Sequence, residues 1–165
     1  MNRSGRHPDR CRSYTKSGMA FLHGERSHIC MYKKDKSKLV LCVDDELVGL
    51  KVRKIVLERA GYRVLTAPDG PSGLSIFAEH PVEAVVLDYS MPGMHGGDVA
   101  KRMRETKPEI PILLLSAYVG LSIDIISLVD LYMTKGEGAP VLLEKLGSLL
   151  HRTDSSQEPS NTRGL

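Results

Sequence analysis

The sequence contains few of the residues that build an aromatic core or a disulfide framework. Among its 165 residues there are no tryptophans, two phenylalanines and three cysteines, although 41% of the residues are hydrophobic. We therefore expect a mainly aliphatic core, in a chain long enough for one domain. The cysteines, Cys11, Cys30 and Cys42, form no C-x-x-C pair and leave an odd thiol in any disulfide scheme. This pattern favours a reducing compartment, and we expect a cytoplasmic protein.

Long apolar segments are also absent from the sequence. Its unbroken apolar runs are a few residues long, far below the roughly 20 residues that a helix needs to cross a bilayer. No segment has the apolar core of a secretory signal peptide. The sequence thus predicts neither a membrane span nor an export signal.

Charge is distributed unevenly along the chain. Residues 1–38 hold ten Lys and Arg against three Asp and Glu, whereas the remaining residues hold thirteen against seventeen. Residues 1–36 show neither helical nor strand periodicity, so we expect a basic, disordered N-terminal extension; a basic arm for nucleic acid or anionic lipid is the alternative. Residues 152–165 are polar and are expected to form a disordered tail. Residues 37–151 then form the domain, and the short tail leaves no room for a DNA-binding module.

Within the domain, short apolar runs alternate with helical patterns. In the first helical pattern, residues 46–62, we expect Leu47, Leu50, Ile55 and Leu57 to form the apolar face, with Gly61 as the stop signal. The expected strands are residues 38–43, 63–67, 82–89, 110–117 and 130–134, and the other expected helices are residues 70–80, 96–106, 121–128 and 139–150. Strands that are apolar on both faces and separated by helices imply a parallel sheet with both faces covered. The sequence therefore predicts an α/β fold with a doubly wound, five-stranded parallel sheet.

Polar residues occur where four of the five expected strands end. Asp44 and Asp45 follow the first strand, Asp88 ends the third, Ser116 the fourth, and Lys135 follows the fifth. Each has an ordinary alternative role, since an Asp can cap a helix, a Ser can close a turn and a Lys can lie at the surface. In open α/β sheets, however, ligands bind beyond the carboxyl ends of the strands. Their joint occurrence favours one functional site at that edge.

The residue types in this set suit phosphoryl chemistry on a metal ion. Three converging carboxylates repel one another unless a cation neutralises them, and oxygen ligands with room for water suit Mg²⁺. If the acidic pair Asp44 and Asp45 holds the metal, Asp88 is left as a nucleophile. The ammonium of Lys135 and the hydroxyl of Ser116 can then hold phosphoryl oxygens. These residues predict an aspartyl phosphate at Asp88.

At this point the motifs "VDDE", "LDYSMPGMHG", "LLLSA" and "YMTKG", in this order, resemble the receiver domain of bacterial two-component response regulators, which includes the chemotaxis regulators. The resemblance covers residues 38 to about 150. It implies a flavodoxin-like fold with strand order 2-1-3-4-5. It also implies a Mg²⁺ ion held by Asp44, Asp45, the phosphoacceptor Asp88 and the backbone carbonyl of Ser90, with Asp45 as the likelier direct ligand of the acidic pair.

The resemblance assigns three further roles, and the sequence departs from the family at one point near them. It implies that Ser116 is the switch hydroxyl, that Tyr132 is the aromatic switch residue and that Lys135 binds phosphate. The family usually has proline after this lysine, whereas this chain has Gly136. A cis peptide before a residue other than proline costs about 3 kcal/mol, so we expect a trans bond and a displaced Lys135. The stretch between Ser116 and Lys135 is also short for the family.

Two functions from different classes follow from these residues. The first is a stand-alone response regulator, a switch and not an enzyme in the usual sense, which assists its own phosphorylation and dephosphorylation at Asp88. It would take the phosphoryl group from a sensor histidine kinase or a phosphotransfer protein. It would bind a downstream protein through the fourth helix, fifth strand and fifth helix of the domain, with a homodimer as a further possibility. The alternative is a receiver-like binding module that works without phosphorylation.

The expected fourth helix is the basis of the docking prediction. Residues 121–129 carry more apolar side chains than a helix of two turns can bury on one face. Either some remain exposed as a docking surface, or a compact connection buries them.

Overall fold

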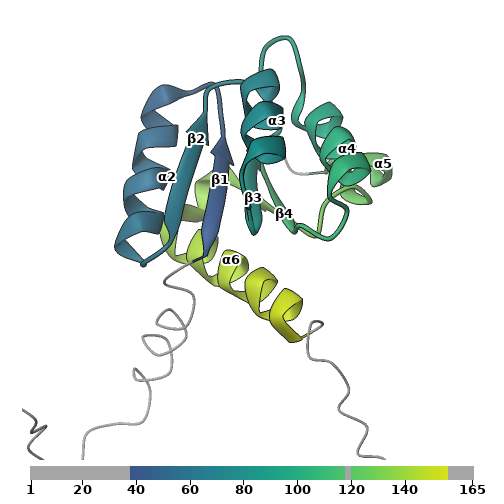
Figure 1. Ribbon diagram of the computed structural model, residues 1–165. Helices are drawn as coiled ribbons and strands as arrows, with labels where there is room; N and C mark the ends of the chain where they lie inside the picture. Colours follow the sequence, from purple (N-terminus) through teal and green to yellow (C-terminus); the bar gives the residue numbers. More distant parts are fainter. Residues whose placement is uncertain (1–37, 118–119, 156–165) are drawn as a thin grey trace, which may run out of the picture.

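The computed structural model describes residues 38–117 and 120–155 of the chain, which form one sheet with helices on both faces (Figure 1). All neighbouring strands are parallel, in the order β2-β1-β3-β4-β5. The strands are β1 (Leu39–Val43), β2 (Arg63–Ala67), β3 (Ala84–Asp88), β4 (Ile112–Ser116) and β5 (Leu131–Thr134). The helices are α2 (Leu47–Arg59), α3 (Gly70–Glu79), α4 (Gly96–Thr106), α5 (Ile123–Ile126), the 3₁₀ helix η1 (Lys135–Glu137) and α6 (Gly138–Ser155). This architecture and strand order confirm the predicted fold class.

The two faces of the sheet have separate aliphatic cores because side chains alternate along a strand. Val40 and Cys42 of β1 pack on one side, with leucines of α2 and α6. Leu41 and Val43 pack on the other side, with Phe77 of α3 and apolar residues of α4. The central strands β1, β3 and β4 are buried along their whole length. This double coverage explains why their sequences are continuously apolar.

The helix α2 differs from the amphipathic helix that the sequence predicted. Leu50 and Leu57 are buried, but Leu47 and Ile55 are 58% and 50% exposed, so their assignment to the apolar face was wrong. The apolar residues of this helix occur on several sides, and the periodic pattern therefore did not define one face. Val48 and Val52 are exposed as well.

Helix α6 runs beyond the helix that the sequence predicted over residues 139–150. It continues through Ser155. Its leucines anchor it on the sheet, and each further turn then gains backbone hydrogen bonds without needing apolar side chains. The predicted N-terminal extension and residues 156–165 of the predicted tail lie outside the described residues, as do Cys11 and Cys30. Among the described helices, none is both long enough and apolar enough to cross a membrane.

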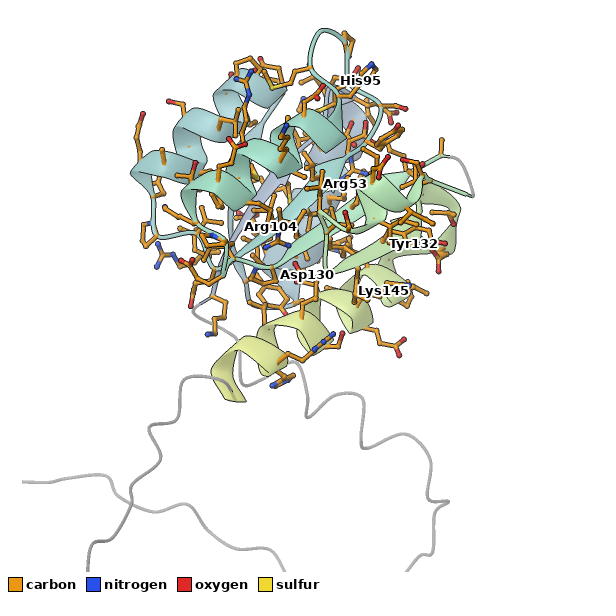
Figure 2. The ribbon with its side chains drawn as sticks, turned by 90° about the vertical axis from the view of Figure 1, so that its right-hand side faces the viewer. Arg53, His95, Arg104, Asp130, Tyr132 and Lys145 are labelled. Carbon is orange, nitrogen blue, oxygen red and sulfur yellow. The ribbon has the colours of Figure 1, made fainter. Side chains whose placement is uncertain are left out.

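Between β4 and β5, the described residues contain one helical turn, α5, where the sequence predicted a helix over 121–128. Arg104 of α4 holds this segment in place: it pairs with Asp130 and donates to the carbonyl oxygen of Leu128 (Figure 2). Asp130 also accepts the backbone N–H of Ile112, at 2.8 Å. The short connection is therefore tied to both α4 and the start of β4.

Candidate functional site

Three carboxylates meet at the carboxyl edge of the central strands. Asp44 follows β1 directly, Asp45 is the next residue, and Asp88 is the last residue of the neighbouring strand β3. One oxygen from each of these side chains lies within 4.8 Å of the others. Asp44 and Asp88 are fully buried, whereas Asp45 is exposed. The structure thus brings together the three acids that the sequence singled out.

Asp88 is the least satisfied of the three carboxylates. The ammonium of Lys135 lies 3.0 Å from its Oδ1, and among the described residues no donor meets either Asp88 oxygen with hydrogen-bond geometry. Burial raises the pKa of Asp88; the contact with Lys135 opposes this rise, and the charges of Asp44 and Asp45 add to it. A buried carboxylate with so few partners costs stability, and such groups are typical of functional sites.

Asp44, by contrast, has partners on both oxygens. Oδ1 accepts the backbone N–H of Glu46 at 2.8 Å. Oδ2 pairs with the guanidinium of Arg53 and lies 3.2 Å from the ammonium of Lys135. Burial acts to lower the pKa of Lys135, but its contacts with Asp88 and Asp44 outweigh burial and raise the pKa above its usual value. Lys135 is thus held as a cation between the two buried acids.

The position of Lys135 corrects one expectation from the sequence. The glycine at position 136 was expected to displace the lysine, yet its ammonium reaches both Asp44 and Asp88. The 3₁₀ helix η1 begins at Lys135 itself, and Thr134 and Glu137 close that turn through a reciprocal cap. A local turn therefore orients the lysine without the proline that is usual in the family.

The loop after β3 is shaped by close backbone packing. Gly93 has a φ of +77°, a conformation that favours glycine, and Met91 is buried. A Cβ atom on Gly96 would lie 2.2 Å from the backbone oxygen of Asp88, so only glycine allows α4 to start this close to β3. The Gly96 amide also donates to the carbonyl of Tyr89. These contacts fix the backbone that carries Asp88.

The remaining predicted site residues occupy the same edge or its border. Ser116 is fully buried at the end of β4 and pairs in register with Thr134, the residue before Lys135. Ser90 lies two residues after Asp88 and is exposed. Tyr132 is 36% exposed on β5, and Figure 2 shows it near Lys145, whose ammonium lies 3.3 Å from the Tyr132 carbonyl. Sequence reasoning missed Arg53, which lies nine positions after Asp44 and contacts it only because α2 packs over the end of β1.

The donor set fits a hard divalent cation. All three acids offer oxygen ligands, the set Mg²⁺ prefers, and the exposed Asp45 leaves a side open for water. The unsatisfied oxygens of Asp88 are the feature of this structure that a cation would satisfy best. Asp44, Asp45 and Asp88 are therefore the side chains that could hold a metal here.

Comparison with known proteins identifies the class to which this fold and site belong. The family model described as "Response regulator receiver domain" matches residues 40–135, more than half of the chain. The chain therefore belongs to the response regulator receiver family, as the sequence motifs predicted. Receiver domains of this family are signalling switches of two-component systems and bind Mg²⁺ at an acidic pocket.

The individual relatives include transcriptional regulators. KdpE of Mycobacterium tuberculosis is 36% identical over 123 residues, which cover 73% of this chain and 54% of KdpE. CseB of Streptomyces avermitilis is 32% identical over 126 residues, which cover 74% of this chain and 53% of CseB. This chain thus spans about half the length of these curated relatives.

Solved structures match at full domain length. A receiver domain protein of Methanospirillum hungatei superposes with a TM-score of 0.70 and 25% identity, covering 72% of this chain and 98% of that one. The response regulator TrrA of Thermotoga maritima, solved in complex with Mg²⁺ and beryllium fluoride, gives a TM-score of 0.65 and 34% identity, covering 68% of this chain and 98% of TrrA.

Proposed function

We propose that this chain is a phosphorylation-dependent response regulator in which Asp88 accepts a phosphoryl group from a sensor histidine kinase or a phosphotransfer protein. The observation that carries the proposal is the buried, poorly satisfied Asp88 carboxylate beside Asp44 and Asp45, with Lys135 3.0 Å away. No structural role explains such an arrangement, because an apolar residue or an Asn at the end of β3 would cost less.

In the phosphoryl transfer, the carboxylate of Asp88 is the one group of the protein that forms a covalent bond. An Asp88 oxygen attacks the phosphorus of the donor, a P–O bond forms, and the electron pair of the broken bond leaves with the donor. Asp44, Asp45, Asp88 and the Ser90 carbonyl would hold a Mg²⁺ ion, whose positive charge would offset these acids. Water later hydrolyses the aspartyl phosphate and restores the carboxylate.

Lys135 and Ser116 act on the transferred group. The ammonium of Lys135 lies 3.0 Å from Asp88 Oδ1 and, after transfer, can form an ion pair with an oxygen of the phosphoryl group on Asp88. Ser116 ends the strand next to β3 and offers a hydroxyl near the same edge. We propose that the phosphoryl group draws in the Ser116 hydroxyl and that Tyr132, which is partly exposed here, turns inward after it.

The surface beside Tyr132 is the proposed output. Ile123 and Ile126 of α5 are 83% and 38% exposed, whereas Ile125 packs partly against the core. Part of this segment is therefore exposed, as a docking surface requires, and part is buried, as in a compact connection. We propose that a downstream protein, or a second copy of the chain, docks on this exposed part of α5 together with β5 and α6.

The stand-alone arrangement is part of the proposal, because the aligned part of this chain covers only 54% of KdpE and 53% of CseB. It is supported by the exposed apolar residues of α5, which could bind a partner protein directly, without an output domain in the same chain. A cytoplasmic location is proposed with it, since the phosphodonor proteins act there.

The second candidate is a binding module that works without phosphorylation. The one-turn α5 and its attachment through Arg104 and Asp130 favour it, because they restrict movement of the segment that would carry the switch.

Beryllium fluoride with MgCl₂ separates the two candidates. If the chain switches, the ¹⁹F spectrum should show a bound species that depends on Mg²⁺, and light scattering or calorimetry should show tighter self-association or partner binding. Asp88→Asn should lose the bound ¹⁹F signal, whereas the control Asp98→Asn, an exposed acid of α4, should keep it. Occupancy of the site without any change in association would favour the binding module.

A further inference from the structure

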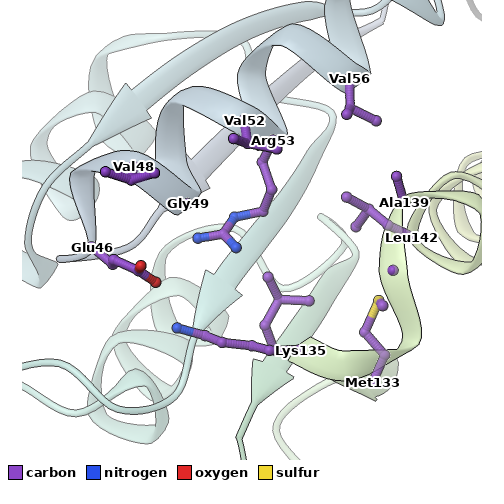
Figure 3. A pocket seen from close by; sticks show the side chains of 12 residues that line it. Glu46, Val48, Gly49, Val52, Arg53, Val56, Met133, Lys135, Ala139 and Leu142 are labelled. Carbon is purple, nitrogen blue, oxygen red and sulfur yellow. The ribbon is translucent and has the colours of Figure 1, made fainter.

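Arg53 is a cation inside the site that none of the family motifs includes. Its side chain is only 14% exposed and pairs with Oδ2 of Asp44, the same oxygen that Lys135 approaches at 3.2 Å. Figure 3 shows the guanidinium of Arg53, from α2, and the ammonium of Lys135, from the start of η1, extending toward the same end of a pocket. Two cations therefore share one carboxylate oxygen.

A glycine in α2 makes room for the contact between Arg53 and Asp44. A Cβ atom on Gly49, one turn before Arg53, would lie 3.1 and 3.4 Å from the two terminal guanidinium nitrogens. These distances are tighter than ordinary van der Waals contact, so a larger residue at Gly49 would push the guanidinium. The absence of a side chain at Gly49 thus leaves room for the largely buried guanidinium of Arg53 to contact Asp44.

The arginine also has space to leave Asp44. It lines a cavity of about 270 Å³ between α2 and the start of α6, whose walls include Val52, Val56 and Leu142. Glu46 lines the same pocket, and its carboxylate and the guanidinium both lie beside Gly49, so a guanidinium that leaves Asp44 has an acidic side chain within reach.

The charges around the acids decide what this contact does. Asp44, Asp45 and Asp88 carry three negative charges, and Arg53 and Lys135 return two positive ones. An incoming divalent cation finds Asp44 already hydrogen-bonded on both oxygens, and it must displace Arg53 or accept a weaker ligand. Because hydrogen bonds between charged groups are stronger than those between neutral groups, displacing Arg53 from Asp44 costs part of the free energy of metal binding.

We propose that Arg53 is an internal competitor of the divalent cation for Asp44 and thereby sets the metal affinity of the site. This inference rests on the proposed function, because it takes the acidic cluster as the metal site. In the absence of metal Arg53 serves as the counter-ion of a buried carboxylate; when metal binds, it releases Asp44 and turns toward Glu46. Arg53 is thus a positioning residue for the metal and need not touch the phosphoryl group.

Direct titration with MgCl₂, followed by the backbone amide resonances of Asp45 and Tyr89, tests this proposal. Arg53→Met removes the charge and keeps the aliphatic length, and it should lower the Kd for Mg²⁺ by roughly tenfold, the worth of a charge-assisted hydrogen bond. Arg53→Gln should act in the same direction and serves if the methionine variant does not fold. Lys51→Met removes the same charge from an exposed position of the same helix, and its Kd should stay within about twofold because salt screens exposed charges.

Thermal unfolding gives a second readout that does not depend on phosphorylation. In EDTA, Arg53→Met should melt below the wild type and below Lys51→Met, because Asp44 loses a counter-ion. Saturating MgCl₂ should raise its melting temperature more than that of the wild type, because tighter binding to the folded state stabilises it more.

The outcomes separate this inference from the proposed function. Equal or weaker Mg²⁺ binding by both Arg53 variants, with ordinary binding by the wild type, overturns the role of Arg53 alone. Absence of Mg²⁺ binding in the wild type and in all variants overturns the metal site itself, and the inference with it.

Discussion

The substitution Asp88→Asn should stabilise the folded protein when no metal is present. Asp88 is fully buried, neither oxygen has a well-aligned donor among the described residues, and Lys135 is its one close cation. An asparagine of the same shape removes the buried charge and the repulsion from Asp44, while Lys135 keeps Asp44 at 3.2 Å. The unfolding free energy should rise by about 1–2 kcal/mol, and the melting temperature by about 3–10 °C.

The pH dependence of this effect follows from the direction of the pKa shift. Burial raises the pKa of Asp88, so the folded state binds the proton more tightly than the unfolded state does. Between the unfolded pKa of about 4 and the raised folded pKa, ionisation of Asp88 therefore removes stability as the pH rises. The advantage of Asp88→Asn should be complete above the folded pKa and should disappear below the unfolded pKa.

Denaturant unfolding in EDTA at several pH values measures both effects. Asp98→Asn is the matched control, because it removes an exposed carboxylate of α4 and should change stability by less than about 0.5 kcal/mol. Saturating MgCl₂ should shrink the difference between Asp88→Asn and the wild type, since the metal satisfies the native carboxylate. An Asp88→Asn protein less stable than the wild type in EDTA at pH 7 would refute the reasoning that Asp88 is poorly compensated.

Two further predictions concern packing and reactivity. Gly96→Ala should lower the unfolding free energy by about 3 kcal/mol or more and disturb Asp88, because its Cβ would lie 2.2 Å from a backbone oxygen. Gly97→Ala should cost less stability, since its Cβ meets the flexible end of the Ile125 side chain. Denaturant unfolding should show this order, and equal losses would contradict it. Burial raises the pKa of Cys42 to about 12, so iodoacetamide should leave this thiol unmodified in the folded protein at pH 8 and alkylate it in guanidinium, as peptide mass mapping can show. Rapid labelling of native Cys42 would mean that β1 opens readily.

The sequence was sufficient to predict the acidic site because of a property of parallel sheets. Continuous apolar runs define buried strands, and the carboxyl ends of neighbouring parallel strands lie at one edge. Asp44 and Asp88 therefore had to converge once the strand order was known. The position of Lys135 also depends on a local feature that the sequence analysis did not predict, the 3₁₀ turn that begins at this residue and is closed by Thr134 and Glu137.

Other features depend on how helices sit on the sheet, which the sequence pattern does not specify. Arg53 looks like an ordinary surface residue of a helix, and its contact with Asp44 follows from the rotation of α2 about its axis. The same rotation leaves Leu47 and Ile55 exposed. The shortness of α5 could not be predicted from its apolar residues, because the ion pair between Arg104 and Asp130 joins segments far apart in the chain.

Phosphoryl transfer to Asp88 is the central claim, and intact-mass spectrometry after incubation with a small phosphodonor tests it most directly. With MgCl₂ the wild type should gain the mass of one phosphoryl group, and EDTA should suppress the gain. Asp88→Asn should gain nothing, Asp98→Asn should label like the wild type, and Lys135→Met should label more slowly. Labelling of Asp88→Asn to the level of the wild type, or labelling that is indifferent to EDTA, would contradict the account.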